Sequence, residues 1–320
     1  MNPITVSPAS KLLAGVELGG TKCVCILGTG PDDVRALERL PTGEREETLR
    51  QIEAVLERWR SQYGNLRALG IASFGPVDLK PGSPTYGFIT STNKPGWRDT
   101  DVAQRLGRRL GVPVGFDTDV NGAALAEGRW GAAQGLDDYA YVTVGTGIGV
   151  GSIVRGRPIF GMNHTELGHI RVVRKAGDKF PGVCSFHGDC IEGLASGPAI
   201  EARASQPASQ LLPDHPAWEY VAHGLGQLMH TIVLTTAPQR IFLGGGVMSA
   251  QAHLFERIRE ELRRSLNHYV EGTELENNLA HYIVPPGLGT MSGPLGALAL
   301  AADAELQVAV QQAPIAAASR

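Results

Sequence analysis

The sequence predicts an α/β protein, and two observations lead to that class. Short apolar runs separated by glycine clusters alternate with segments of helical periodicity, and a strand–glycine turn–strand pattern occurs twice. Glycine is abundant, with 41 residues in a chain of 320, and many of them stand in clusters between apolar runs. This pattern favours an enzyme with tight phosphate-binding turns over a fibrous or coiled protein. The length allows two domains or one large domain with a substantial core.

The first expected elements are three strands and a helix. Residues 12–18 and 23–27 are apolar and residues 34–40 alternate, which predicts a strand meander rather than a βαβ unit. The first turn of this meander is Gly19-Gly20-Thr21-Lys22. A helix is expected over 44–63, because glutamates occupy its first turn and apolar residues recur on one face. That face consists of Leu49, Ile52, Val55, Leu56 and Trp59.

The chain then alternates between strands and a short helix. Residues 68–73 read as a buried strand, and residues 113–118 read as a strand that ends at Asp119. Between these strands we expect Thr100 to cap a helix. The apolar face of that helix would consist of Val102, Leu106 and Leu110.

From residue 119 onwards the pattern restarts. Residues 121–130 are expected to be helical, and strands over 139–144 and 148–154 flank the turn Gly145-Thr146-Gly147. The repeated pattern suggests two similar halves, although the identity between them is too low to establish a duplication. Further helices are expected over 196–204, 218–236, 255–266 and 289–302, and strands over 240–243, which enters Gly244-Gly245-Gly246, and 283–284.

Composition excludes several classes of protein. The net charge is −3 and charged residues make up 19% of the chain, so no basic field attracts nucleic acid. No apolar run reaches the length of a membrane span. Residues 1–11 lack the apolar core of a signal peptide, and four cysteines suggest a reducing compartment rather than a disulfide scaffold. We therefore expect a cytoplasmic protein that binds neither membrane nor nucleic acid.

A cluster of potential metal ligands is the most informative feature of the chain. His169 is followed by the run Cys184-x2-His187-x2-Cys190, with Glu166 and Glu192 on the flanks. Tetrahedral Zn²⁺ takes four nitrogen or sulfur ligands, and these four residues supply that set. The alternative is two buried cysteines and two ordinary histidines. A four-ligand site leaves no position for water, so we expect a structural zinc and not a catalytic one.

Three glycine clusters could bind phosphate or nucleotide. Gly19, Gly20 and Thr21, together with Lys22, and then Gly145, Thr146 and Gly147 offer free N–H groups between strands. Gly244, Gly245 and Gly246 could let a nucleotide ring or ribose pack on bare backbone. Each cluster alone could be an ordinary turn or a close helix–strand contact. Three in this order form a stronger signal, although the chain has no P-loop and no dinucleotide-binding fingerprint.

Polar residues next to these turns are candidates for chemistry. Asp119 stands at a strand-to-helix junction, where it could be a general base or a helix cap. Asn121 and Asn93 could bind hydroxyl groups, although Asn93 could also belong to an ordinary loop. Glu17 lies among apolar residues of an expected strand, and we expect it near Mg²⁺ or Lys22, or else on the exposed face of an edge strand.

These motifs together resemble the ROK family of sugar kinases. The resemblance runs from about residue 12 to about residue 302 and is closest to the bacterial zinc-containing fructokinases. Two features distinguish that branch, namely glutamate before the first Gly-Gly-Thr-Lys and Cys-x2-His-x2-Cys in place of Cys-x-Cys-x4-Cys. The matching segments are Glu17 to Lys22, Asn93 to Trp97, Thr118 to Glu127, Thr143 to Gly149, Glu166 to His169, Cys184 to Glu192 and Leu243 to Met248.

The resemblance implies an actin-like, RNase H-like ATPase fold with two α/β domains around an interdomain cleft. The small domain would span 1–118 and receive the helix 289–306, and the large domain would span 119–288 and contain the zinc. ATP and Mg²⁺ would be the cofactors, with Asp119 as the base. Asn93, Asn121, Glu166, His169 and Glu192 would hold the sugar, so that His169 would serve both zinc and sugar. The longer side chain of Glu17 leaves the magnesium arrangement open.

The implied activity is transfer of the ATP γ-phosphate to the 6-hydroxyl of D-fructose by a homodimeric enzyme. Mannose or glucose could replace fructose, because the sugar-holding residues discriminate poorly among hexoses. Two other classes are a sugar-sensing repressor and an inactive sugar-binding protein. A repressor would need about 60 or more residues of helix-turn-helix ahead of the first phosphate strand, where about a dozen are present. Asp119 and the three glycine turns argue against the inactive protein.

Overall fold

We analysed a computed structural model that describes residues 12–270, 272, 275 and 278–312. Residues 1–11, in which we saw no signal peptide, lie outside this range. The chain divides into two compact units. Unit 1 comprises 1–122 and 293–320, and unit 2 comprises 123–292. Within the described residues, no helix combines the length and apolar character that a bilayer crossing requires.

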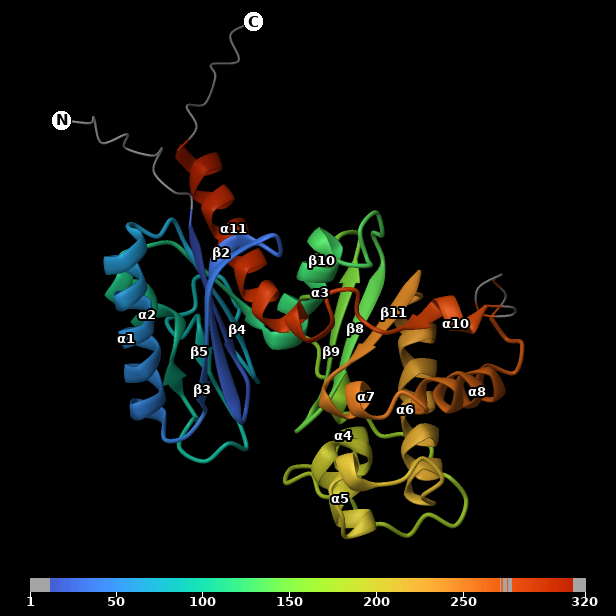
Figure 1. Cartoon of the computed structure of the whole chain (residues 1–320). Coiled ribbons are helices and arrows are strands. Elements are labelled where there is room, and N and C mark those ends of the chain that lie inside the picture. The colour runs from blue at the N-terminus through green and yellow to red at the C-terminus, as the bar shows by residue number, and fades with distance from the viewer. Residues whose placement is uncertain (1–11, 271, 273–274, 276–277, 313–320) are drawn as a thin grey trace, which may run out of the picture. The chain divides into compact units, whose positions relative to one another are not determined.

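Unit 1 is a five-stranded mixed sheet with helices on both faces (Figure 1). Its strand order is β3-β2-β1-β4-β7, in which β1, β2 and β3 form the expected antiparallel meander and β4 and β7 run parallel to β1. The strands are β1 (Leu13–Leu18), β2 (Lys22–Gly30), β3 (Asp33–Pro41), β4 (Leu69–Ser73) and β7 (Val114–Thr118), and a small ribbon pairs β5 (Phe88–Ile89) with β6 (Thr100–Asp101).

The alternation of side chains along β1 decides what each face of this sheet contacts. Ala14, Val16 and Leu18 belong to the apolar core shared with α1 (Arg45–Tyr63) and α2 (Ala103–Leu110). On the opposite face, a Cβ on any of three sheet glycines would collide with α11 (Ser292–Gln312), so that this helix lies directly on the sheet backbone. These glycines are Gly15, Gly70 and Gly115.

Unit 2 repeats the same sheet topology with shorter outer strands. Its order is β10-β9-β8-β11-β12, again with an antiparallel meander followed by two parallel strands, and four of these five strands are labelled in Figure 1. The strands are β8 (Tyr139–Val144), β9 (Ile148–Val154), β10 (Arg157–Pro158), β11 (Arg240–Gly244) and β12 (Ile283–Val284). The two similar halves that the repeated glycine turn suggested are therefore present in the fold.

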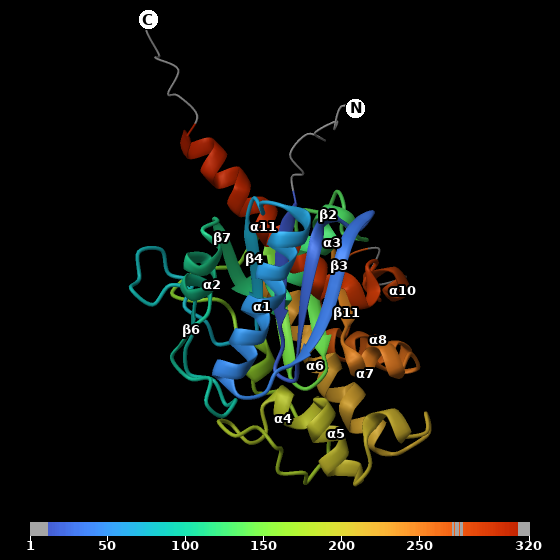
Figure 2. The same ribbon diagram turned by 60° about the vertical axis from the view of Figure 1, so that its left-hand side comes forward.

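Helices cover both faces of this second sheet. One face packs on α6 (Ala217–Thr236), and the other carries the Tyr139 hydroxyl, which donates to Ala124 O on α3 (Asp119–Trp130) at 3.1 Å. The remaining elements are η1 (Leu167–His169), α4 (Ile191–Ala195), α5 (Gly197–Ala204), η2 (Ala208–Gln210), α7 (Gly246–Ala250), α8 (Leu254–Leu266), α10 (Leu279–Tyr282) and η3 (Gly289–Met291). Figure 2 labels the strand β11 and the helices α6 and α8 of this unit.

Three expectations about helix ends need correction. Thr100 does not cap α2, because it pairs with Ile89 in β6 and its hydroxyl donates to Trp97 O at 2.6 Å. Asp101 takes the capping role instead, since its Oδ1 accepts from Arg105 N at 3.0 Å. The helix expected from residue 121 begins at Asp119, and the last helix begins at Ser292, after a 3₁₀ turn, and continues to Gln312.

Candidate active site

Asp119 is the first residue of α3 and directly follows β7. Its Oδ1 accepts a hydrogen bond from Val120 N at 2.9 Å, which orients the half-buried carboxylate. Burial raises the pKa of Asp119 to about 6, against the lowering effect of backbone hydrogen bonds. A carboxylate with this pKa is ionised at neutral pH yet basic enough to accept a proton from a hydroxyl group.

Glu17 provides a second carboxylate close to Asp119. It lies on the same face of β1 as Gly15, and a Cβ on Gly293 would come within 2.1 Å of Glu17 Oε1. Burial, and then the charge of Asp119, raise the pKa of Glu17 to about 7, while Lys22 and Arg39 lower it. Two neighbouring carboxylates that both resist ionisation suit a divalent cation, which would neutralise them together.

Asn121 and Asn93 stand in different environments. Asn121 is buried, and its Nδ2 donates to Asp117 Oδ1 at 2.8 Å, so one end of its amide is already bound. Asn93 is exposed. Sequence reasoning missed Asp117, whose pKa is raised by burial. The signal was available, because Asp117 and Asp119 alternate at a strand end, and register places Asp117 in one row with Ala72 and Glu17.

A lysine side chain fixes the first glycine turn through hydrogen bonds to the backbone. Gly19 N donates to Lys22 O at 3.0 Å, and a Cβ on Gly20 would meet nothing within 4 Å. Lys94 Nζ donates to Gly20 O at 2.7 Å and to Thr42 O at 2.9 Å. Thr21 and Lys22 are exposed, so the turn keeps an open side. The role of Lys94 in fixing this turn was also not predicted from the sequence, where only Asn93 of its loop was a candidate.

The second and third glycine clusters lie next to each other in unit 2. Gly145 N donates to Gly147 O at 2.9 Å, and a Cβ on Gly145 would lie 3.9 Å from Gly246 N. Gly245 has φ +92° and packs against β8, where a Cβ would lie 2.4 Å from Val144 O. Thr146 is exposed, and Gly244 packs beneath on Tyr141 and Pro286. Two adjacent loops of bare backbone fit a nucleotide.

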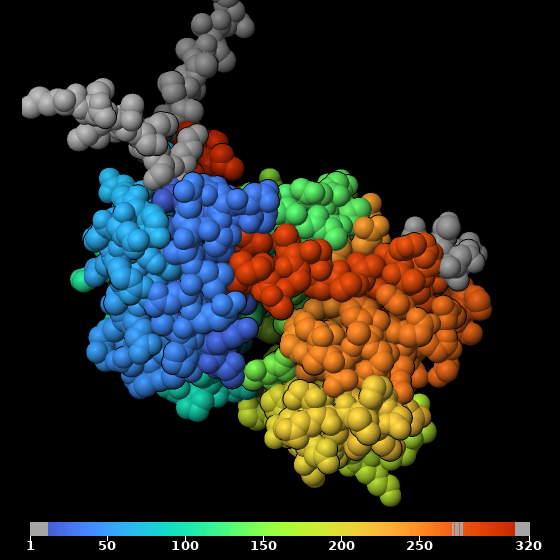
Figure 3. Space-filling view, viewed as in Figure 1, coloured from blue at the N-terminus to red at the C-terminus, as the bar shows by residue number. Residues whose placement is uncertain are grey.

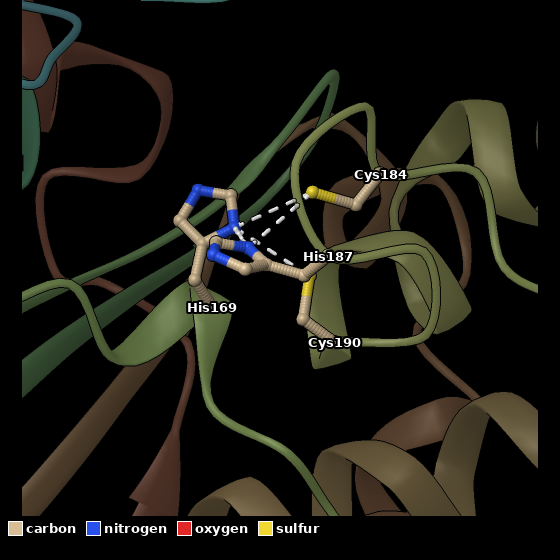
Figure 4. A group of neighbouring side chains, drawn as sticks. All are labelled: His169, Cys184, His187 and Cys190. Atoms are coloured by element: carbon tan, nitrogen blue, oxygen red, sulfur yellow. Dashed lines mark hydrogen bonds between the residues drawn. The ribbon is translucent and has the colours of Figure 1, made fainter. Parts of the chain in front are cut away.

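The four potential zinc ligands converge on one point (Figure 4). Cys184 Sγ lies 3.7 Å from Nδ1 of both His169 and His187, Cys190 Sγ lies 3.5 Å from His169 Nδ1, and the two Nδ1 atoms are 3.3 Å apart. Tetrahedral zinc with bonds of ~2.3 Å to sulfur and ~2.0 Å to nitrogen would separate S from N by about 3.5 Å and N from N by about 3.3 Å. The donor set and its spacing therefore fit that ion.

Glu192 joins this cluster to the second glycine turn. It follows Cys190 by two residues, and its Oε2 accepts from Ile148 N at 3.0 Å. Its Oε1 lies 3.9 Å from His169 Nε2, so the histidine presents one ring nitrogen to the cluster and the other to a carboxylate. A Cβ on residue 147 would come within 2.6 Å of Glu192 Oε2, so any residue larger than glycine would collide with this carboxylate.

Glu166 begins the segment that leads to this histidine. Its carbonyl accepts from His169 N at 3.0 Å, and its partly exposed carboxylate lies 3.4 Å from His164 Nδ1. The expected site residues thus form two groups. Glu17, Asn93, Asp119, Asn121 and the first turn belong to unit 1, and Glu166, His169, Glu192 and the other glycine clusters belong to unit 2.

Comparison with known proteins decides the family. The family model "ROK family" matches residues 13–304. The chain belongs to the ROK family. It is similar to the fructokinase of Zymomonas mobilis subsp. mobilis, with 42% identity over 92% of this chain and 98% of that protein. The fructokinase of Pediococcus pentosaceus is 39% identical over 91% of this chain and 97% of its own length.

Solved structures of ROK proteins have the same fold as this chain. The ROK hexokinase from Thermus thermophilus superimposes with a TM-score of 0.74 and 29% identity, covering 93% of this chain and 99% of that one. A ROK family glucokinase from Streptomyces griseus, in complex with glucose and AMPPNP, gives a TM-score of 0.73 and 25% identity over 91% and 99% of the two chains. The expected actin-like ATPase fold is therefore confirmed.

Proposed function

We propose that this chain is an ATP-dependent fructokinase that transfers the γ-phosphate of ATP to the 6-hydroxyl of D-fructose. The choice of sugar is supported by fructokinases at 39% and 42% identity over at least nine-tenths of the chain. A glucokinase from Halalkalibacterium halodurans is more distant, with 26% identity. The observation that carries the chemistry is Asp119, an oriented carboxylate whose pKa is raised to about 6 at the start of α3.

In this proposal Asp119 accepts the proton of the attacking sugar hydroxyl. Phosphoryl transfer requires an in-line hydroxyl, a base and neutralisation of phosphate charge, and little covalent work by the protein. Asn93, Asn121, Glu166, His169 and Glu192 bind the other sugar hydroxyls. The carboxylates of Glu166 and Glu192 accept hydrogen bonds there, which offsets their own desolvation.

The glycine clusters bind the nucleotide. Amides of the turns at Gly19–Lys22 and Gly145–Gly147 face phosphate oxygens, and Gly244–Gly246 face the adenosine. Glu17 would lie near Mg²⁺, whose chemistry is to neutralise charge on the phosphates, and Asp119 stays free to act as the base. Zinc at His169, Cys184, His187 and Cys190 would fix the loop that carries Glu192, with no part in the chemical step. The cytoplasmic location and the homodimer stay predictions.

The test is a hexose panel with ATP and Mg²⁺, in which ADP release is followed and the phosphorylated carbon of the product is identified. Fructose is expected to give the highest kcat/KM, with phosphate at carbon 6. Preference for glucose or mannose would correct the sugar but keep the reaction class. Stoichiometric sugar binding without ADP release would replace the proposal with a sugar-sensing or inactive binding protein.

A further inference from the structure

Glu127 is a buried carboxylate on α3 that the proposed reaction does not use. Its side chain is fully buried, and its two oxygens accept four hydrogen bonds. Oε2 accepts from Ala132 N at 2.9 Å and Gly287 N at 3.0 Å. Oε1 accepts from Leu288 N at 3.0 Å and from the Ser292 hydroxyl at 2.8 Å. All five residues belong to unit 2.

The carboxylate and its donors lie near the two places where the chain passes between the units: Glu127 is on α3 and Ala132 follows its end, while Gly287, Leu288 and Ser292 form the segment before α11. The first passage follows Gly122 inside α3, and the second follows Ser292 at the start of α11. Glu127 lies about a turn and a half beyond the first passage. Ser292 is the last residue before the second passage, and Gly287 and Leu288 lead up to it. One carboxylate therefore ties the two connections together within unit 2.

Close packing leaves this arrangement little freedom. A Cβ on Gly131 would come within 2.1 Å of Glu127 Oε2, and a Cβ on Gly287 within 2.6 Å of Ala132 N. The segment that leads into α11 lies at the surface (Figure 3), while Glu127 and Ser292 beneath it are buried. Because water cannot replace a hydrogen bond lost at such a buried site, the substitution of one oxygen disturbs the whole set.

The same two helices also contact each other inside unit 1, beside the candidate carboxylates. A Cβ on Gly122 would lie 3.5 Å from the carbonyl carbon of Gly296, so α3 and α11 cross with their backbones close together. Gly293 packs against Glu17, and Asp119 is the first residue of the helix that carries Glu127. Displacement of Glu127 would therefore be transmitted along α3 to Asp119.

We propose that Glu127 is a positioning residue for phosphoryl transfer. It locks the two connections into one hinge, so that they move together when substrates bind and carry Asp119 into place. The proposal rests on the fructokinase activity proposed above. Catalysis by correct placement is sensitive to small displacements, so a loosened hinge lowers kcat in a protein that still folds and still binds ATP.

The test compares Glu127→Gln with a matched control, Asp178→Asn. Glutamine places an NH₂ group against two of the four donors and keeps the volume. Asp178 is also a buried carboxylate of unit 2, with bonds from Arg203 Nη1 at 2.7 Å and Phe180 N at 3.1 Å, but it lies on neither connection. Each protein is assayed at a fixed interval below its own melting temperature, and small-angle scattering records the change in radius of gyration when fructose and AMPPNP are added.

We expect Glu127→Gln to lose about 10-fold in kcat with KM for ATP within about 2-fold, and to compact less than the wild type does. Asp178→Asn is expected to melt earlier but to keep kcat and compaction. Equal kcat and compaction in Glu127→Gln and wild type would overturn the proposal, as would equal losses in both variants or a wild type that turns over without compacting. If Glu127→Gln does not fold, Ser292→Ala replaces it, with an expected loss of about 3-fold. A wild type inactive on fructose would instead refute the fructokinase proposal.

Discussion

At the scale of single residues, the site depends on two carboxylates that the fold holds in unfavourable surroundings. Glu17 and Asp119 both have pKa values raised chiefly by burial, and the charge of Asp119 adds to the effect on Glu17. Natural sequences accept such a cost where a ligand or a reaction needs it. The raised pKa values of both residues therefore indicate a functional site, in agreement with the sequence motifs.

The pKa of Asp119 predicts the acid limb of the pH–rate profile. A base must be deprotonated to act, so activity is lost as pH falls through its pKa. With a pKa raised to about 6, kcat/KM for fructose is expected to decline about tenfold per pH unit below 6. An aspartate with an ordinary pKa would stay active down to about pH 4. Constant kcat/KM between pH 7 and 5 would therefore remove Asp119 as the titrating base.

The raised pKa of Glu17 predicts how the stability of the folded protein changes with pH. Because its folded pKa is raised from 4.5 to about 7, protonation favours the folded state, and stability falls as pH rises from 4.5 through 7. At pH 8 without Mg²⁺, Glu17→Gln is expected to stabilise the protein by on the order of 2–3 kcal/mol, with little gain at pH 4.5. Calorimetry at both pH values tests this, with exposed Glu201→Gln as control. Equal effects at both pH values would contradict it.

At the scale of elements, local sequence signals located most strands, while side-chain partners needed the structure. The apolar runs and glycine turns predicted both ends of β1, β8 and β9 to within one residue, whereas β2 continues to Gly30, beyond the predicted end at Leu27. Thr100 was misassigned, because residues that cap helices also occur in turns. The structure shows that Thr100 belongs to β6, which pairs with β5, and that its hydroxyl donates to Trp97 O. The bond between Asn121 and Asp117 was likewise invisible, since a motif names residue types and not their partners.

The Cys–His loop is the element whose stability should depend most on a metal. Cys190→Ala removes one of four potential ligands and is expected to abolish zinc binding, with a large loss of stability in unit 2, since structural zinc contributes on the order of 10 kcal/mol in small modules. Metal analysis and thermal unfolding measure both effects. Cys25→Ala, at a buried thiol of β2, is the control and should keep its metal. Wild-type protein purified without bound zinc would refute the assignment.

In the third glycine cluster, we expect Gly245 to have a structural role and Gly246 to have a role in nucleotide binding. Gly245→Ala is expected to destabilise the protein by about 2 kcal/mol or more, because φ is +92° and the new methyl would meet Val144 O at 2.4 Å. Gly246→Ala meets no atom within 4 Å and should keep its melting temperature while raising KM for ATP. Unchanged KM in Gly246→Ala would exclude this loop from the nucleotide site.

At the scale of the whole molecule, the repeated sheet topology gives each unit an equivalent turn between its first two strands. Gly19–Lys22 joins β1 to β2, and Gly145–Gly147 joins β8 to β9. Sequence alone suggested this repeat from the glycine turns, and it predicted β12 over 283–284, but the identity of the strand orders could not be predicted, because β10 spans two residues and was not expected. Strands this short leave almost no periodic signal.

The most direct test of the account is the turnover of Asp119→Asn with fructose, ATP and Mg²⁺. We expect kcat to fall by at least ~10²-fold, the usual loss when a general base is removed. The melting temperature at pH 8 should not fall, because the variant removes a carboxylate whose ionisation the folded state disfavours. Turnover within about threefold of wild type would contradict the role of Asp119 and, with it, the proposed mechanism.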